Sequence, residues 1–348
     1  MRHEKPLKSS RIDLPDTVED IYQSVCDQGW GDGLPVVPPT EERVHQMIDY
    51  TCEDPDRVVA EVAPLGGEAT IEKIAINAVM AGCLPEYMPV LVAVVEAMAP
   101  QEFNLTAIQT TTNPVTVLTI VNGPIRHKIK LNCTRGCMGP GYRANATIGR
   151  AIRFILLNIG CGIPDTVDKA IHGMPGKYTF CFGEDEEGNP WQPFHVDKGF
   201  DKETSTVTVI GAQATHNVLT NSPDTATFLK LVANSMSTMG NNDMVLGGGQ
   251  PVVVITSAHA AILAGEGFSK KIVKDFLFAN AGVPVAEYPI LGTTAGKDIY
   301  VANGKVMPCR TADDIMLVVA GADNPLHIVT IPTFGETRAV TKAIDRAD

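Results

Sequence analysis

The chain lacks the features that would place it in a membrane or on a nucleic acid. None of its 348 residues belongs to a long uninterrupted apolar run, and segment 1–16 is polar, without the apolar core of a signal peptide. Long runs of lysine and arginine are also missing, and the formal net charge is −12. That charge disfavours nucleic acid and anionic membrane surfaces as partners. We therefore expect a cytoplasmic protein with a small-molecule substrate.

The sequence also lacks the motifs of common cofactor sites. Only Cys133 and Cys137 of the eight cysteines lie close together, which predicts neither a zinc site nor a disulfide framework. The glycines at 247–249 are not followed by Gly-Lys-Ser or Gly-Lys-Thr, and no Gly-x-Gly-x-x-Gly follows a first strand. No nucleotide cofactor is expected, whereas a divalent metal remains open.

What the sequence does contain is an ordered set of similar segments. With 44% apolar and 20% charged residues, the composition is that of a globular protein. The similar pairs are 70–82 with 227–240, 113–123 with 250–260, 146–160 with 267–282, 175–180 with 295–300, and 205–212 with 314–322. Helix and strand patterns alternate in them, which predicts an α/β fold made of two divergent copies of one α/β unit.

The predicted organisation is a short helical and extended segment over 1–65, a first repeat over 66–222 and a second over 223–348. Helices are expected at 17–28 and 41–51, with Thr40 as the N-cap of the latter. The β-branched runs behind Pro114 and Pro251 are typical of strands buried on both faces in partly parallel sheets. An apolar duplicated unit rich in small residues is also compatible with a homo-oligomer.

The segment WGDGLPVVPPT (30–40) is specific enough to suggest relatives. It resembles the N-terminal signature of a group of poorly characterised bacterial proteins that includes the UGSC-motif (seleno)protein family. The stretches 77–90, 143–154 and 175–200 are similar to a longer conserved-hypothetical relative. This resemblance implies a bacterial metabolic protein. Because the chain has no Cys-Gly-Ser-Cys motif, the redox role suggested for selenocysteine-bearing relatives does not carry over.

Candidate binding residues follow from where α/β proteins place their ligands. Ligands gather beyond the carboxyl ends of strands, which points to the loops 121–145 and 257–267 converging on one cleft. The first loop is rich in glycine and enters a helix expected near Thr147, a setting that favours an anion. The predicted substrate-binding residues are Asn122, Arg143, Asn145, Arg150, His195 and Lys270.

The candidate catalytic residues are His259, Glu184, Glu266 and Cys137. His259, aligned with Asn122 at a strand end, would be a general base helped by Glu184 or Glu266. Cys137 would be a nucleophile whose pKa is lowered by the helix start and nearby arginines. The competing interpretations are a packed core histidine, a solvated acidic turn and a small buried cysteine.

These residues together predict a catabolic enzyme, a hydrolase or lyase. It would act on a polar or carboxylate-bearing small molecule by acid–base chemistry in the cleft between the two repeats. Two alternatives stay open. One is a ligand-binding or accessory partner of a redox (seleno)protein, docking through the N-terminal segment and Trp30. The other is a metalloenzyme that uses His216, His259 or His327.

Overall fold

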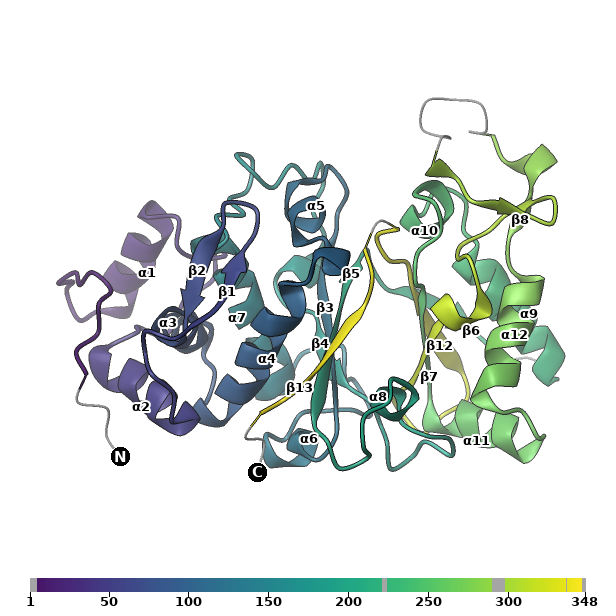
Figure 1. Ribbon diagram of the computed structural model, residues 1–348, viewed down its shortest axis with the longest axis horizontal. Coiled ribbons are helices and arrows are strands. Elements are labelled where there is room, and N and C mark those ends of the chain that lie inside the picture. Colours follow the sequence, from purple (N-terminus) through teal and green to yellow (C-terminus); the bar gives the residue numbers. More distant parts are fainter. Residues whose placement is uncertain (1–4, 221–223, 290–297, 336, 346–348) are drawn as a thin grey trace.

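The protein is built in four layers, with two sheets packed face to face and helices outside each of them (Figure 1). The computed structural model describes residues 5–220, 224–289, 298–335 and 337–345. The first sheet contains, in order, β4 (Cys181–Gly183), β3 (Thr116–Asn122), β5 (Thr206–Ala212) and β13 (Val340–Ala343). The second contains β11 (Met316–Val319), β7 (Val252–Ile255), β12 (His327–Ile331) and β6 (His216–Leu219). This mixture of helix and sheet confirms the predicted α/β class.

Helices cover the outer face of each sheet. The first sheet carries α4 (Met88–Met98) and α7 (Arg143–Asn158), and α3 (Ile71–Ala81) packs against these two helices on the side away from the sheet. The second sheet carries α9 (Thr225–Met236), α11 (Ser257–Gly265) and α12 (Lys270–Asn280). The shorter helices are α5 (Leu105–Thr110), α6 (Ile125–Lys128), α8 (Phe194–Asp197) and α10 (Asn242–Val245). Within the described ranges, no helix combines the length and the apolar run that crossing a bilayer requires.

Two small sheets and two further helices complete the described strands and α-helices. The hairpin β1 (Val58–Val62) and β2 (Gly67–Thr70) leads into α3, while β8 (Val283–Pro284), β9 (Val301–Ala302) and β10 (Lys305–Val306) form a sheet after α12. The expected N-terminal helices are α1 (Val18–Asp27) and α2 (Glu41–Thr51). The side chain of Thr40 caps α2 by accepting the Arg43 N–H, as predicted.

The alternating direction of side chains along a strand explains how β3 contributes to the cores on both faces of its sheet. In β3, Val117 and Val121 join the core beneath the helices, whereas Leu118 and Ile120 face the second sheet. Successive side chains of a strand point to opposite faces, so a strand covered on both sides must be apolar throughout. All seven residues of β3 are buried, which confirms the prediction of a doubly buried strand.

The two large sheets share one pattern of strand directions. β3 runs parallel to β4 and antiparallel to β5, which is antiparallel to β13. In the same way β7 runs parallel to β11 and antiparallel to β12, which is antiparallel to β6. β6 follows β5 in the chain but belongs to the second sheet, and β13 follows β12 but belongs to the first sheet. After β5 and again after β12, the chain therefore crosses to the other sheet.

This arrangement corrects one detail of the predicted repeat. The match of 205–212 with 314–322 is wrong, because β5 is antiparallel to β3 whereas β11 is parallel to β7. By strand direction, β11 corresponds to β4 and β12 to β5. The match of 175–180 with 295–300 and the boundary at 222/223 fall largely outside the described residues.

The chain leaves α7 and α12 differently, although a glycine follows each helix. Gly282 after α12 adopts the left-handed conformation that often ends a helix, with φ of 89°. After α7, however, Cys161 rather than Gly160 has a positive φ, of 57°. A Cβ on Gly160 would lie 2.5 Å from the Ala63 carbonyl oxygen, so this glycine is needed for close packing against the β1–β2 hairpin.

The segment that carries the family resemblance is fastened to α7. The Arg150 guanidinium binds both carboxylate oxygens of Asp32, at 2.7 and 2.8 Å, and donates to the carbonyls of Leu34 and Pro35. Arg150 was predicted to bind substrate, whereas in the structure its Nε and Nη2 donors hold this segment. The segment 30–40 therefore has a structural role against α7.

Replacing Arg150 by methionine is expected to lower the free energy of unfolding by about 3 kcal/mol, because it leaves the buried Asp32 carboxylate without its cation. The Asp32 side chain is only 5% exposed. Urea denaturation measures the loss. The double variant Asp32→Asn/Arg150→Met, which removes both charges, should recover part of it. Equal losses in the single and double variants would contradict this account.

Candidate functional site

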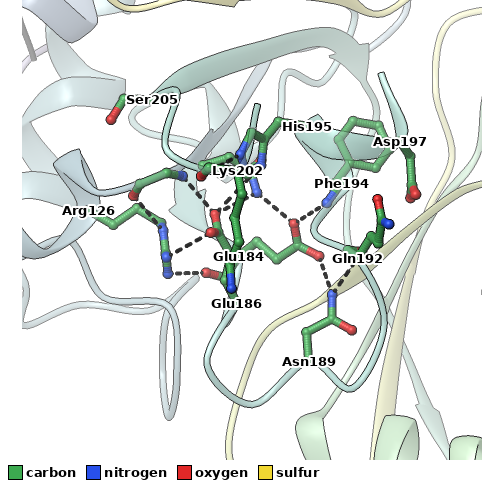
Figure 2. Close-up of polar contacts among 12 residues, drawn as sticks. Arg126, Glu184, Glu186, Asn189, Gln192, Phe194, His195, Asp197, Lys202 and Ser205 are labelled. Carbon is green, nitrogen blue, oxygen red and sulfur yellow. Dashed lines mark hydrogen bonds and ion pairs between the residues drawn. The ribbon is translucent and has the colours of Figure 1, made fainter. Parts of the chain in front are cut away.

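A cluster of buried polar side chains lies where β3 and β4 end (Figure 2). Asn122 is the last residue of β3 and Glu184 follows β4 directly, and the parallel pairing makes these two ends neighbours. The Asn122 amide donates to Glu184 Oε2 at 2.6 Å and to Glu186 Oε1 at 3.0 Å. The fold thus joins two residues that the sequence analysis had assigned separate roles.

Glu184 is fully buried and surrounded by N–H groups. Besides Asn122, the Asn189 amide donates to Glu184 Oε1 at 3.0 Å, and the Phe194 backbone N–H donates to Oε2 at 2.6 Å. Burial raises the pKa of Glu184 because it penalises the charged form. A carboxyl group enclosed in this way holds the segment 184–197 against β3, and it is closed to a substrate.

Arg126 is the main cation of this cluster and was missed by the sequence analysis. It is 2% exposed, and its Nη2 lies 3.1 Å from Glu186 Oε2 and 3.0 Å from Glu187 Oε1. Its Nη1 donates to the Glu184 carbonyl at 2.6 Å. The available signal was an arginine four residues after an apolar strand, in a region where a buried charge has to be paired.

His195 packs into the same cluster. Its side chain is fully buried, and Nε2 lies 3.2 Å from the Lys202 carbonyl oxygen. A carbonyl only accepts, so Nε2 carries the ring proton. The other nitrogen, Nδ1, is 3.9 Å from Glu186 Oε1, too far for a hydrogen bond. His195 was predicted to bind substrate, but its burial places it inside the protein rather than on an open site.

An open hollow of about 370 Å³ lies instead between the two sheets at the carboxyl ends of β7 and β11. The glycine-rich residues 135–139 form one wall, and residues 320–329 form the opposite one. Two backbone hydrogen bonds join the first half of the chain to β11 and the segment after it, from the Gly321 N–H to the Cys133 carbonyl and from the Asp185 N–H to the Val319 carbonyl. The predicted 121–145 loop therefore does converge on a strand end, although its partner is the segment after β11.

The lining of the hollow is mainly apolar with a few polar groups. Val254, Leu326 and Val329 supply aliphatic surface, and Thr256 and Asn324 supply polar groups. The cationic group is Arg135, which is exposed to solvent. His327 lies beside them, and its Nδ1 is 3.2 Å from the Asn217 amide nitrogen. Because the amide donates, Nε2 of His327 carries the ring proton.

His259 differs from its prediction in position and in exposure. It was expected at a strand end, but β7 stops at Ile255 and His259 is the third residue of α11, which Thr256 caps. The ring is 2% exposed, with Nδ1 at 2.8 Å from Thr256 Oγ1 and Nε2 at 2.8 Å from Thr220 Oγ1. Burial, followed by the nearby His327, lowers the pKa of His259 to about 4. The ring is therefore neutral at pH 7.

Neither predicted carboxylate helper reaches His259. Glu266 is exposed at the far end of α11, about seven residues or 10 Å along the helix axis. The carboxyl group of Glu184 is held in the buried cluster by Asn122, Asn189 and Phe194. The two hydroxyl groups of Thr220 and Thr256 orient the His259 ring instead.

The expected activation of Cys137 is wrong. The thiol was predicted to have a lowered pKa, but Cys137 is only 5% exposed, and burial raises its pKa to about 12. Its neighbours in the hollow wall do not offset that penalty. A thiol that stays protonated at neutral pH is a poor nucleophile, so Cys137 acts as a small apolar part of the wall.

The remaining predicted residues contact other parts of the protein and lie away from the hollow. Asn145 is buried and binds the loop backbone at Asn132 and Cys137. Arg143 starts α7, four residues before the expected start, and its Nε donates to the Gly82 carbonyl at 2.9 Å. Lys270 pairs with Asp197 at 2.6 Å. None of these three side chains lines the hollow.

The described part of the chain offers no ready set of ligands for a metal ion. No three or more histidine, cysteine or carboxylate side chains there are grouped so that they could hold a metal ion. His216 and His327, two of the histidines considered for such a site, are exposed on the neighbouring strands β6 and β12.

Comparison of the chain with models of protein families, with curated proteins and with solved structures found no match.

Proposed function

We propose that the protein is an enzyme, a hydrolase or lyase, which acts on a small carboxylate-bearing organic molecule bound in the hollow. The observation that supports this most is the hollow itself, with its volume of about 370 Å³ at the carboxyl ends of the parallel strands β7 and β11. Small-molecule sites are typically concave, mostly apolar and furnished with a few polar groups, and they favour this position in α/β folds.

The lining favours a ligand with one anionic and one apolar part. Arg135 would bind the carboxylate, because its planar guanidinium can donate two parallel hydrogen bonds. Val254, Leu326 and Val329 would contact the apolar part. His327 offers a ring N–H, and Thr256 a hydroxyl group, for proton transfer to or from the reacting atoms.

We also propose that the two halves derive from one unit, since their sheets share strand order and direction. The place in the first sheet that would correspond to the hollow is at the ends of β3 and β4. There the buried cluster around Glu184 occupies the space, and Trp191 from the same segment donates to the Phe268 carbonyl in the other half. One of two related positions is thus filled by side chains, which supports the hollow as the working site.

Titration calorimetry with benzoate tests this proposal without knowledge of the substrate. Benzoate should bind, and Arg135→Ala should weaken binding by roughly 10- to 100-fold, because a hydrogen bond to a charged group contributes about 1.5–3 kcal/mol. The neutral isostere benzamide should bind much more weakly than benzoate. Arg143→Ala is the matched control, since Arg143 belongs to the same loop region but lies outside the hollow.

Equal affinity of benzoate for the wild-type protein and for Arg135→Ala would overturn the assignment of the carboxylate site. Binding that depends on Arg135, without turnover of any carboxylate ester, amide or hydroxy acid in a broad panel, would favour the ligand-binding role over the enzyme.

A further inference from the structure

The junction between β7 and α11 carries a hydroxyl group in contact with a histidine. Thr256 stands between the last residue of the strand and the first of the helix, and it lines the hollow. Its Oγ1 donates to the Asn324 carbonyl oxygen at 3.1 Å and lies 2.8 Å from His259 Nδ1. Rotation of the hydroxyl from this carbonyl toward Nδ1, in the tautomer that leaves Nδ1 without a proton, brings its proton to a group that can take it.

His259 is held in place from the other side. Its Nε2 lies 2.8 Å from Thr220 Oγ1, and its ring packs against Phe228 with 5.6 Å between ring centroids. The lowered pKa of His259, about 4, keeps the ring neutral at pH 7. The order hydroxyl, imidazole and orienting group, each within hydrogen-bond distance of the next, is the arrangement that activates a hydroxyl nucleophile.

We propose that Thr256 is the nucleophile and His259 its base, and that the enzyme is a hydrolase that passes through a covalent acyl–threonine intermediate. This inference rests on the proposed function, because it needs the substrate to lie in the hollow. It narrows the substrate to a carboxylic ester, thioester or amide whose acyl part carries the carboxylate that Arg135 would bind.

The reaction balances with water as the only co-reactant. Thr256 Oγ1 forms a bond to the acyl carbon while its proton passes to His259 Nδ1. The bond from that carbon to the leaving group then breaks, and the leaving group departs with the proton from His259. Water next attacks the acyl carbon and gives a proton to His259. The bond to Thr256 breaks, and the hydroxyl regains the proton from the imidazole.

Diisopropyl fluorophosphate tests the proposal without a known substrate, because a nucleophilic hydroxyl displaces its fluoride. Peptide mapping by mass spectrometry of the labelled full-length protein should place a single phosphoryl adduct on Thr256. Thr256→Val, of similar shape, should not be labelled. His259→Gln should be labelled about 100-fold more slowly, in line with the usual contribution of a general base, whereas Thr220→Val should fall in between.

Ser269 is the matched internal control. It caps α12 as Thr256 caps α11, by accepting the Ile272 N–H at 3.2 Å, and it is more exposed. It should stay unlabelled, because an N-cap hydroxyl without a base is not activated. An unlabelled Thr256 in the folded wild-type protein, or equal labelling rates in wild type and His259→Gln, would overturn the proposal.

The test separates this inference from the proposed function. If benzoate still binds through Arg135 while Thr256 stays unlabelled, the assignment of the carboxylate site is supported and only the assignment of Thr256 as nucleophile is wrong. If benzoate does not bind and Thr256 is labelled, the nucleophile is supported and the proposed carboxylate specificity is wrong. Wild-type mapping decides the question even if a variant fails to fold.

Discussion

Replacing Arg126 by methionine is expected to lower the free energy of unfolding by about 3–5 kcal/mol, because removing one member of a buried ion pair leaves its partner uncompensated. The Glu186 side chain is 6% exposed and would lose its cation, and the Glu184 carbonyl would lose a donor at 2.6 Å. Methionine preserves much of the volume, so the loss reports on charge and hydrogen bonding. Urea or thermal unfolding of both proteins measures it.

Glu187→Gln is the control for Arg126→Met. Glu187 also pairs with Arg126, at 3.0 Å, but its side chain is 58% exposed, and exposed pairs contribute only about 0–1 kcal/mol. The arginine variant should therefore lose several times more stability than the glutamate variant. Comparable small losses in both would mean that the cluster is not what holds the segment 184–197 in place.

The elements of the fold were largely predictable because each depends on local sequence. Thr40 predicts a helix start, and the apolar run after Pro114 predicts a buried strand, and both are observed. The buried face of a helix was harder to predict. The apolar spacing of Ile272, Phe276 and Ala279 indicates one buried face for α12, yet Ile272 is 47% exposed, and Val273 and Leu277 are buried instead. Both sets have helical spacing, and only the position of the second sheet decides between them.

The partners of the site residues were not predictable, because they come from distant parts of the chain. Arg150 near a glycine-rich loop suggests an anion site, but Asp32, 118 residues away in sequence, takes its donors. Cys137 beside arginines suggests a reactive thiolate, but burial raises its pKa. In both cases the local residue types were those of a site, and the tertiary contacts gave them another role.

The position of the hollow was predicted better than the residues that line it. The rule that ligands lie beyond the carboxyl ends of strands led to the loop that does form one wall of the hollow. It could not identify Thr256, because the sequence analysis extended the strand to residue 260 and so placed His259 at its end. A threonine that follows a strand directly and caps the next helix leaves no distinct pattern in the amino-acid sequence.

The contribution of Asp243 to the stability of the protein is expected to fall as the pH rises from about 4 to about 8. This residue of α10 is fully buried, its Oδ1 accepts from the Thr333 N–H and hydroxyl, and burial raises its pKa to about 8. The folded state therefore holds the Asp243 proton more tightly than the unfolded state, whose pKa is near 3.8. Stability is lost between these two values, at up to about 1.4 kcal/mol per pH unit.

Asp243→Asn should remove this contribution, because an amide keeps the shape and the acceptor oxygen but has no proton to lose. At pH 5 the variant should be within about 1 kcal/mol of the wild type, and at pH 8 it should be more stable by several kcal/mol. Unfolding by urea at half-unit steps of pH gives the two curves, and their difference isolates Asp243 from the other titrating groups. Asp313→Asn, at an exposed aspartate whose pKa is lowered by Lys274, is the control. If Asp243→Asn and the wild type gave parallel curves from pH 5 to pH 8, Asp243 would have to be ionised in the folded protein.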